Sequence, residues 1–524
     1  MIINFFKNKE YIYIFLIFLI SILFNQYYGF IGVQPIDSFF PFNSGYDVLN
    51  GKYPFKDYWT ITGPFMDLVQ AFLFNILGIS WFSYVLHASV FNFLFALATF
   101  YTLYKFELSI DYCFIYTILV SILAYPSSGT PYVDHQSAYL STIGVYSFIL
   151  ALKTNEKKYW FFLPVMFVLS FLTKQTPTGY IFLVIGFLYL THLIFNFQFQ
   201  NLLYTFLGSF ISLSVFFLFL YLGNIPLNSF YQQYILYPMS LGESRLSFLF
   251  PFEFQRFFLR FKLIHLGYLI LVILAIKNFI NKKKYYKNPE LLVILSLIGL
   301  SFSLVTHQLM TINGKYIFFL IPILFAFSHI FYNEYFKNKN YLLYIILILS
   351  ICSTVYYWYY YIHKRDFMDL SKADINKSID AKIIHPKLKG LKWITPQYIN
   401  NPQNEIKILK EAINLIKEDK NKKIIVTDYQ FISVINSEYD FSPNKVWYYF
   451  HIYPSKDHKY FYIYKDFFIN KIRINNIKSI YTVKPLYGDD DVIKEILNKE
   501  CYKKINITPI LDKHIFLECP DLKN

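Results

Sequence analysis

The chain has 524 residues, of which 55% are hydrophobic and 16% are charged, and its formal net charge at pH 7 is +15. Soluble domains carry about 25% charged residues, so this composition excludes an ordinary soluble protein. Lysine is spread along the chain without a basic or zinc-knuckle motif, so the positive charge predicts no nucleic-acid partner.

Many apolar runs are long enough to cross a membrane, which takes roughly 18 or more residues. The first run follows Lys7 and Lys9 and lacks a small-residue cleavage site, so we expect a retained anchor. We predict about eleven spans, at 11–31, 81–104, 112–126, 136–152, 159–173, 178–195, 202–223, 263–280, 289–307, 316–332 and 341–361. The sequence therefore predicts a polytopic α-helical membrane protein.

Loop charge predicts the orientation, because short loops rich in lysine and arginine face the cytoplasm. If the N-terminus is cytoplasmic, the inside loops hold Lys105, Lys153, Lys157, Lys158, Lys277, Lys282, Lys283, Lys284, Lys287, Lys337 and Lys339. The short outside loops hold Lys174 and Lys315, whereas the longer outside loop at 224–262 is basic and breaks the trend. An odd number of spans then places the C-terminus outside, so we expect a multi-pass membrane protein with a cytoplasmic N-terminus and an extracytoplasmic C-terminus.

Two outside segments, 32–80 and 224–262, are too long to be simple connectors. They combine aromatic residues with apolar residues at helical spacing, as in "FMDLVQAFLFNIL". We expect short helices that lie along the membrane interface.

The composition changes at His363, where charge rises and apolar runs shorten. We predict a transmembrane domain over 1–362 and a soluble extracytoplasmic α/β domain over 363–524. Within the second domain, 404–419 is an amphipathic helix with Ile406, Leu409, Ile413 and Ile416 on one face. Buried strands are expected within 422–432 and 477–486, with a hairpin near the end.

Cys501 and Cys519 flank the predicted hairpin. They can form a disulfide if the domain is outside the cytoplasm. Two free thiols fit the sequence as well.

Ionisable groups close to a bilayer are costly and usually face a cavity or a partner. The predicted outer side carries a set of such groups and one polar neighbour, Gln175; the ionisable ones are Asp37, Lys56, Asp57, Asp134, His135, Lys174, Arg245, His307 and Lys315. Asp37 and Asp134, the latter with His135, can act as a base or as metal ligands. The cations and His307 can bind an anion such as a phosphate.

The same residues can also have purely structural roles. Asp37 and Asp134 can be helix N-caps, and Lys174 can extend its ammonium to the interface without binding anything. The arginine residues of 224–262 can touch lipid headgroups only. Asp47 and Asp67 are interpreted as solvated.

Several stretches resemble the GT-C superfamily of membrane glycosyltransferases, nearest to the protein mannosyltransferase and aminoarabinose transferase branch. These are the first span followed by Asp37, then "YPFKDYW" and Gly63-Pro64, "YVDHQSAYL", "LTKQTPTGY" and "GKYIFFLIPILFAF". The resemblance extends over roughly residues 1–360. One departure is Ser38, because the protein mannosyltransferases carry an Asp-Glu pair where this chain has Asp37-Ser38.

The resemblance implies inverting transfer of a sugar from a polyprenyl-phosphate donor to an extracytoplasmic acceptor, which is a glycan, lipid or protein. It also implies a location in the bacterial inner membrane. Asp37 falls on the family's general base. Asp134 and His135 fall near a second-loop position that binds a divalent metal, such as Mg²⁺ or Mn²⁺, in some branches. Lys174 would contact the donor phosphate, helped by Arg245 or Lys315, and Lys56, Asp57, Gln175 and His307 are further substrate-binding candidates.

Other functions remain open at this point. An O-antigen polymerase-like enzyme would use a diphosphate-linked lipid oligosaccharide. A lipid or glycan transporter, or a non-catalytic scaffold, would consume no donor. We expect the acid and the cations to share one pocket at the outer rim of the membrane.

Overall fold

The computed structural model describes residues 9–250, 253–281, 289–335, 340–436, 440–445, 452–486, 491–517, 519 and 522. It divides into two compact units. The first comprises Met1–Gly29, Val85–Leu218 and Ser244–Phe367. The second comprises Phe30–Tyr84, Phe219–Glu243 and Met368–Asn524.

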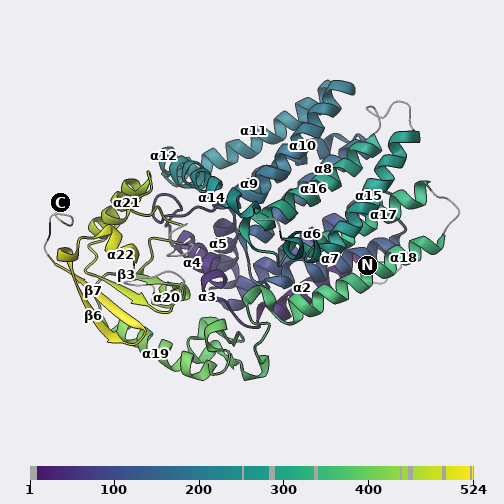
Figure 1. Ribbon diagram of the computed structural model, residues 1–524. Helices are drawn as coiled ribbons and strands as arrows, with labels where there is room; N and C mark the ends of the chain where they lie inside the picture. Colours follow the sequence, from purple (N-terminus) through teal and green to yellow (C-terminus); the bar gives the residue numbers. More distant parts are fainter. Residues whose placement is uncertain are drawn as a thin grey trace. The chain divides into compact units, whose positions relative to one another are not determined.

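Long helices build the first unit (Figure 1). In chain order they are α2 (Lys9–Gly29), α6 (Trp81–Lys105), α7 (Ile110–Leu123), α8 (Val133–Thr154), α9 (Lys157–Phe171), α10 (Gln175–Phe195), α11 (Phe199–Leu222), α15 (Lys262–Asn281), α16 (Pro289–Thr311), α17 (Leu320–Tyr335) and α18 (Asn340–Tyr357). Each predicted span falls on one of these helices, so the polytopic helical fold is confirmed.

Among the described residues, eight helical stretches are long and apolar enough to cross a membrane. Helices α8, α9 and α15 are not among them. Helix α8 packs against α9, α10 and α16, and most of its side chains are buried. Its serine, threonine and histidine side chains therefore lie inside the protein, which explains how a less apolar helix fits among the spans.

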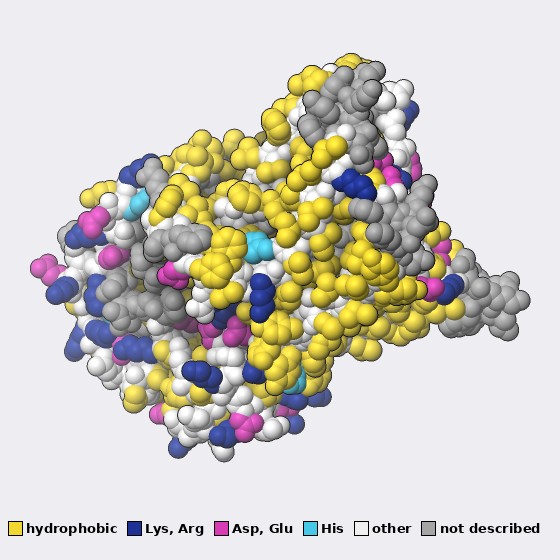
Figure 2. Space-filling model, turned by 45° about the vertical axis from the view of Figure 1, so that its right-hand side comes forward, with side chains coloured by type: hydrophobic (Ala, Val, Ile, Leu, Met, Phe, Trp, Pro, Cys, Tyr) yellow, Lys and Arg dark blue, Asp and Glu magenta, His cyan; other side chains and the backbone are white. Residues whose placement is uncertain are grey.

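The outer surface of the helical unit is apolar. Helices α10 and α11 expose large side chains, among them Leu183 (70%), Phe187 (70%), Phe206 (62%) and Phe210 (59%). Figure 2 shows hydrophobic side chains over much of the surface of the helical unit. An apolar surface of this extent is stable in lipid rather than in water.

The second unit contains a five-stranded sheet in the order β4-β3-β5-β7-β6. The strands are β3 (Lys423–Thr427), β4 (Asp440–Phe441), β5 (Ser479–Val483), β6 (Tyr502–Thr508) and β7 (Leu511–Phe516). Strands β4, β3 and β5 are parallel, and β7 runs antiparallel to both β5 and β6. The predicted buried strands and the final hairpin are confirmed.

Helices α19 (Pro402–Glu418), α20 (Phe431–Ile435), α21 (Phe461–Ile474) and α22 (Asp491–Ile496) accompany the sheet, and a small ribbon pairs β1 (Ile379–Asp380) with β2 (Lys392–Trp393). Helix α19 begins where the Asn401 side chain accepts a hydrogen bond from the Asn404 backbone N–H. Its four predicted apolar residues are all buried. Cys501 and Cys519 form a disulfide, so the first of the two thiol alternatives is confirmed.

Short helices occupy both long loops, as predicted. The first loop holds α3 (Pro35–Ser38), α4 (Phe40–Leu49) and α5 (Phe65–Leu77). The second holds α12 (Leu227–Phe230), a π-helical turn (Tyr231–Leu236), α13 (Tyr237–Ser240) and α14 (Gly242–Leu246). Helix α5 is amphipathic, with Phe74 buried and Phe72 and Ile76 about 60% exposed.

Aromatic side chains join the first loop to the sheet region inside the second unit. The Phe39 ring lies 4.9 Å from the Phe431 ring and 6.0 Å from the Trp393 ring. The indole N–H of Trp59 donates to the carbonyl of Ile452 (3.1 Å). The core of this unit thus combines 30–84 with residues after 368, whereas the domain boundary at 362/363 stays a prediction.

Candidate functional site

One end of the helical unit gathers polar groups from five chain segments. They come from the turn after α7, the start of α8, the residue before α10, the end of α16 and the turn before α17. The central members are Asp134, Lys174 and His307, with Ser127 and Tyr316 beside them. Three predicted site residues, far apart in the sequence, are therefore in contact.

Asp134 and Lys174 form a buried ion pair. The Lys174 ammonium donates to both carboxylate oxygens of Asp134, at 2.7 and 2.8 Å. The His307 Nε2 lies 3.4 Å from Oδ1 of the same carboxylate, too poorly aligned for a hydrogen bond. The exposed fractions of the side chains are 7% for Asp134, 17% for Lys174 and 1% for His307. A buried carboxylate needs such a counter-charge, because removal from water is costly.

His135 and Tyr316 complete this end of the unit. The Ser127 hydroxyl and the His135 Nε2 lie 2.8 Å apart, and the His135 ring stacks on Tyr316 with 4.4 Å between centroids. The Tyr316 hydroxyl lies 3.4 Å from the His307 Nδ1. His135 therefore contributes to the packing of the cluster, while its neighbour Asp134 carries the charge.

Arg365 holds the turn after α7, and it is not among the residues selected from the sequence. Its guanidinium donates to the carbonyls of Pro126 (3.0 Å), Ser127 (3.3 Å) and Ser128 (2.8 Å). The side chain is among the largest fully buried ones. It thus fixes the turn that presents Ser127 to His135.

The other predicted residues of this unit lie around the cluster. Arg245, in the last turn of α14, is close enough to His307 to act on it electrostatically. Gln175 opens α10 directly after Lys174. The Lys315 ammonium donates to the backbone carbonyl of Asp366 (2.9 Å) and lies 3.8 Å from its carboxylate, so Lys315 has a structural partner.

Asp37 lies in the second unit, half-buried within α3. The N-cap of α3 is Gln34, and the N-cap of α8 is Tyr132. The interpretation of Asp37 and Asp134 as N-caps is therefore wrong. Both lie inside a first helical turn, where the helix dipole favours a negative charge.

Lys56 and Asp57 make local contacts in the second unit. The Lys56 ammonium donates to the carbonyl of Gly223 (3.0 Å). Asp57 accepts from the backbone N–H of Tyr53 (2.8 Å) and pairs with Lys471 (3.2 Å). These contacts fix the loop, and substrate binding by either residue stays a prediction.

The interpretation of Asp47 and Asp67 as solvated is wrong, because both are buried. Asp47 pairs with the fully buried ammonium of Lys445. Asp67 accepts hydrogen bonds from the hydroxyls of Ser44 (2.6 Å) and Tyr58 (2.6 Å). Burial raises the pKa of Asp67 to about 6. The local sequence could not show that Asp47 is buried, because its partner Lys445 lies far along the chain.

The cluster does not fit a divalent metal. Among the described residues, no group of three or more His, Cys, Asp or Glu side chains is placed to hold one. Mg²⁺ and Mn²⁺ prefer several oxygen ligands. Here Asp134 is the one acid of the group, and an ammonium already occupies both of its oxygens.

No family model and no curated protein matches the sequence. Solved structures with a similar fold include the archaeal oligosaccharyltransferase AglB from Archaeoglobus fulgidus, in complex with an inhibitory peptide and a dolichol-phosphate. It is 13% identical, with a TM-score of 0.42 over 91% of this chain and 70% of AglB. A second AglB structure, in complex with Zn and sulfate, is 12% identical, with a TM-score of 0.41 over 90% of this chain and 68% of AglB.

ArnT from Cupriavidus metallidurans is similar along its whole length. Its apo structure is 10% identical, with a TM-score of 0.44 over 96% of this chain and 97% of ArnT. A structure of ArnT bound to undecaprenyl phosphate gives a TM-score of 0.39 with the same identity and coverage. AglB and ArnT are GT-C superfamily membrane glycosyltransferases, the superfamily that the sequence resembles. All four TM-scores lie below 0.5, so the case for a function rests on the residues of this chain.

Proposed function

We propose that this chain is a membrane glycosyltransferase that moves a sugar from a polyprenyl-phosphate carrier to an acceptor on the extracytoplasmic face. The observation that carries the proposal is the buried Asp134–Lys174–His307 cluster at one end of an apolar helical unit. Lys174 balances the charge of Asp134, and Arg245, which acts electrostatically on His307, adds a positive charge to this end of the unit. A phosphate at the end of a lipid chain carries negative charge that these cations can bind, and it lies at the membrane surface, where the cluster is expected.

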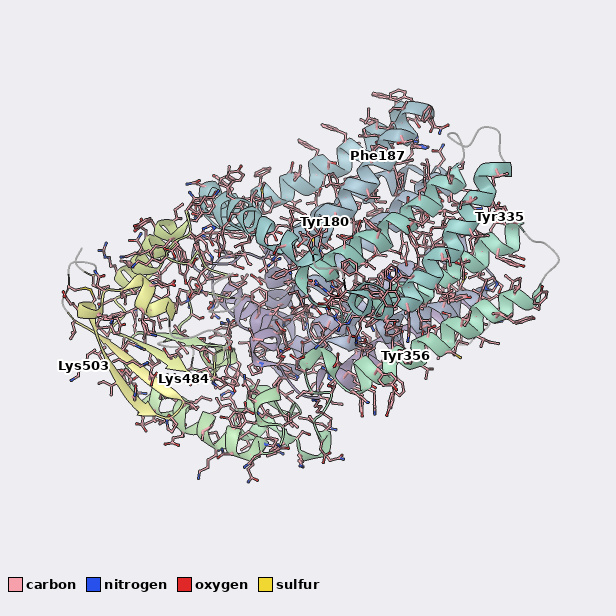
Figure 3. All side chains as sticks on the ribbon, viewed as in Figure 1. Tyr180, Phe187, Tyr335, Tyr356, Lys484 and Lys503 are labelled. Atoms are coloured by element: carbon pink, nitrogen blue, oxygen red, sulfur yellow. A yellow bond between two sulfur atoms is a disulfide. The ribbon has the colours of Figure 1, made fainter. Side chains whose placement is uncertain are left out.

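A lateral groove gives the carrier chain a place. It measures about 500 Å³ and runs between α10, α15 and α16, lined by Leu183, Val184, Phe187, Leu188, Tyr268, Leu295, Ile298, Gly299 and Phe302. Figure 3 shows Phe187 and Tyr180 along α10. Lys174 is the residue before α10, and Leu183, the first residue of the groove, lies on α10 nine residues after it. The first isoprene units can therefore lie in the groove while the phosphate meets Lys174.

The proposed reaction balances without any further reactant. The acceptor hydroxyl oxygen attacks the anomeric carbon, and the bond from that carbon to the phosphate oxygen breaks. The electron pair of that bond stays on the phosphate, where Lys174 and Arg245 stabilise the added charge. Asp37 takes the proton of the hydroxyl as general base. The products are a glycoside with inverted configuration and a polyprenyl phosphate.

The disulfide supports an extracytoplasmic second unit. Cys501 and Cys519 are bridged, and stable disulfides belong to oxidising compartments. The opposite end of the helical unit carries Lys9, which pairs with Asp111, and Lys153, which pairs with Glu107. The other lysines expected inside include six that lie outside the described residues: Lys282, Lys283, Lys284, Lys287, Lys337 and Lys339. Both observations support the predicted orientation in a bacterial inner membrane.

The test is transfer of a radiolabelled sugar from a synthetic polyprenyl-phosphate donor in proteoliposomes supplied with cell-envelope lipid and glycan acceptors. We expect wild-type protein to release polyprenyl phosphate, Asp37→Asn to lose at least about a hundredfold in rate, and Lys153→Met to keep the wild-type rate. Full activity in Asp37→Asn would remove Asp37 from the role of base. Donor consumption only with a diphosphate-linked carrier would favour the polymerase-like alternative.

A further inference from the structure

We infer that the Lys174 ammonium is the resident cation of this site and does the work that a divalent metal would do, so that the chain binds a polyprenyl phosphate without metal. The ion pair itself is observed in the structure. The identity of the phosphate ligand rests on the proposed function, whereas independence from metal does not.

The Lys174 ammonium lies against both oxygens of the Asp134 carboxylate. Its nitrogen is nearly equidistant from the two oxygens of Asp134, at 2.7 and 2.8 Å. Lys174 is the residue before α10, with extended backbone, so its side chain leaves the helix axis at a fixed point. Thr178 supports this turn, because its hydroxyl donates to the Lys174 carbonyl (2.9 Å).

Besides Asp134, the surrounding side chains provide few ligands for a cation. His307 reaches the same carboxylate through Nε2 and is the second potential ligand. The Nε2 of His135 is engaged by Ser127 and its ring stacks on Tyr316, whereas its Nδ1 has no hydrogen-bond partner. Among the described residues, no three His, Cys, Asp or Glu side chains are placed to hold a metal ion. Mg²⁺ and Mn²⁺ prefer more oxygen ligands than the one carboxylate offers, whereas that carboxylate suits the ammonium of Lys174.

An ammonium can still serve the phosphate. Lysine has three N–H donors, and two of them point at Asp134. The third can donate to a phosphate oxygen, so Lys174 bridges Asp134 and the ligand as a metal ion bridges a carboxylate and a phosphate. Asp134 then has the role of holding the lysine and is a positioning residue.

The first experiment uses the wild-type protein in lipid nanodiscs. Thermal stability and binding of undecaprenyl phosphate are measured after EDTA treatment and after adding back Mg²⁺, Mn²⁺ or Zn²⁺. We expect neither the unfolding midpoint nor the dissociation constant to change. If EDTA lowers the unfolding midpoint or weakens binding, and a metal restores that property, the inference is overturned, whether or not the protein transfers sugar.

The second experiment uses Lys174→Ala with added amines. We expect undecaprenyl phosphate to bind at least about tenfold more weakly than to wild type, since a charge-assisted hydrogen bond is lost. Propylammonium should restore binding, whereas tetramethylammonium, which has charge but no N–H, should not. Lys153→Ala is the matched control, because its partner Glu107 is 83% exposed and Lys153 lies in the last turn of α8, at the far end of that helix from Asp134. Wild-type affinity in Lys174→Ala, or equal rescue by both cations, would contradict the inference.

If Lys174→Ala fails to fold, the double variant Asp134→Asn/Lys174→Ala is measured in its place, because it has no unpaired buried charge. We expect this variant to fold, to bind undecaprenyl phosphate as weakly as the single variant, and to gain nothing from Mn²⁺. Strong Mn²⁺-dependent binding by the double variant would contradict the inference.

Discussion

Asp67 offers a pH test of the second unit. Its carboxyl is fully buried and accepts hydrogen bonds from Ser44 and Tyr58, and burial raises its pKa from 3.8 to about 6. Because the pKa is higher in the folded than in the unfolded protein, the folded state binds more protons between these two values. Stability therefore falls as the pH rises from about 4 to about 6.

The magnitude follows from the shift. Each pH unit of displacement corresponds to about 1.4 kcal/mol, so a shift of about two units costs roughly 3 kcal/mol above pH 6. Asp67→Asn removes the titration, and its amide can still bond to the two hydroxyls, which can each donate or accept.

The assay compares thermal unfolding of wild type and Asp67→Asn in detergent at several pH values between 4 and 8. We expect the variant to gain stability relative to wild type as the pH rises, with the gain complete above pH 6. The matched control is Asp57→Asn, whose carboxylate is partly exposed and paired with Lys471. If the stability of wild type instead rises relative to that of Asp67→Asn between pH 4 and pH 6, the pKa of Asp67 is not raised by folding.

Three further predictions concern the fold. Lys174→Met should destabilise the protein by roughly 3–5 kcal/mol, because Asp134 is left buried and unpaired. The double variant Asp134→Asn/Lys174→Met should recover most of this lost stability. If the losses of the two substitutions in thermal unfolding are additive, the pair is not coupled. Arg365→Met should leave three backbone carbonyls without their donor and cost on the order of 3 kcal/mol, with Arg365→Lys milder; equal unfolding midpoints for the two variants would be inconsistent with this role. Cys501→Ser should cost roughly 3 kcal/mol through the lost loop closure with Cys519, and a wild-type midpoint that is indifferent to reductant would count against it.

The helices of the first unit could be predicted because lipid imposes a simple rule. Each span needs a long apolar run, and such runs are visible in the sequence. The sequence also led to Asp134, Lys174 and His307, since charged and polar residues beside apolar spans are rare and costly. The structure adds that these residues touch one another, which no single segment of the sequence could reveal.

The second unit was harder to predict because its core is assembled from distant segments. Phe39 packs against Phe431, and Asp47 pairs with Lys445. Asp47 and Asp67 lie in a predicted loop outside the membrane, where solvation is the natural interpretation of a carboxylate. Arg365 was missed for a similar reason, because its acceptors are backbone carbonyls, which leave no mark on the sequence.

The most direct measurement is photo-crosslinking of a polyprenyl phosphate that carries a photoreactive group in its first isoprene units, followed by peptide mass spectrometry. We expect labelling of the groove residues of α10 and α16, among them Leu183, Phe187 and Phe302. Unlabelled undecaprenyl phosphate should compete for these sites, and Lys174→Ala should strongly reduce their labelling. Labelling elsewhere, or labelling of the groove that neither competitor nor Lys174→Ala reduces, would contradict the account.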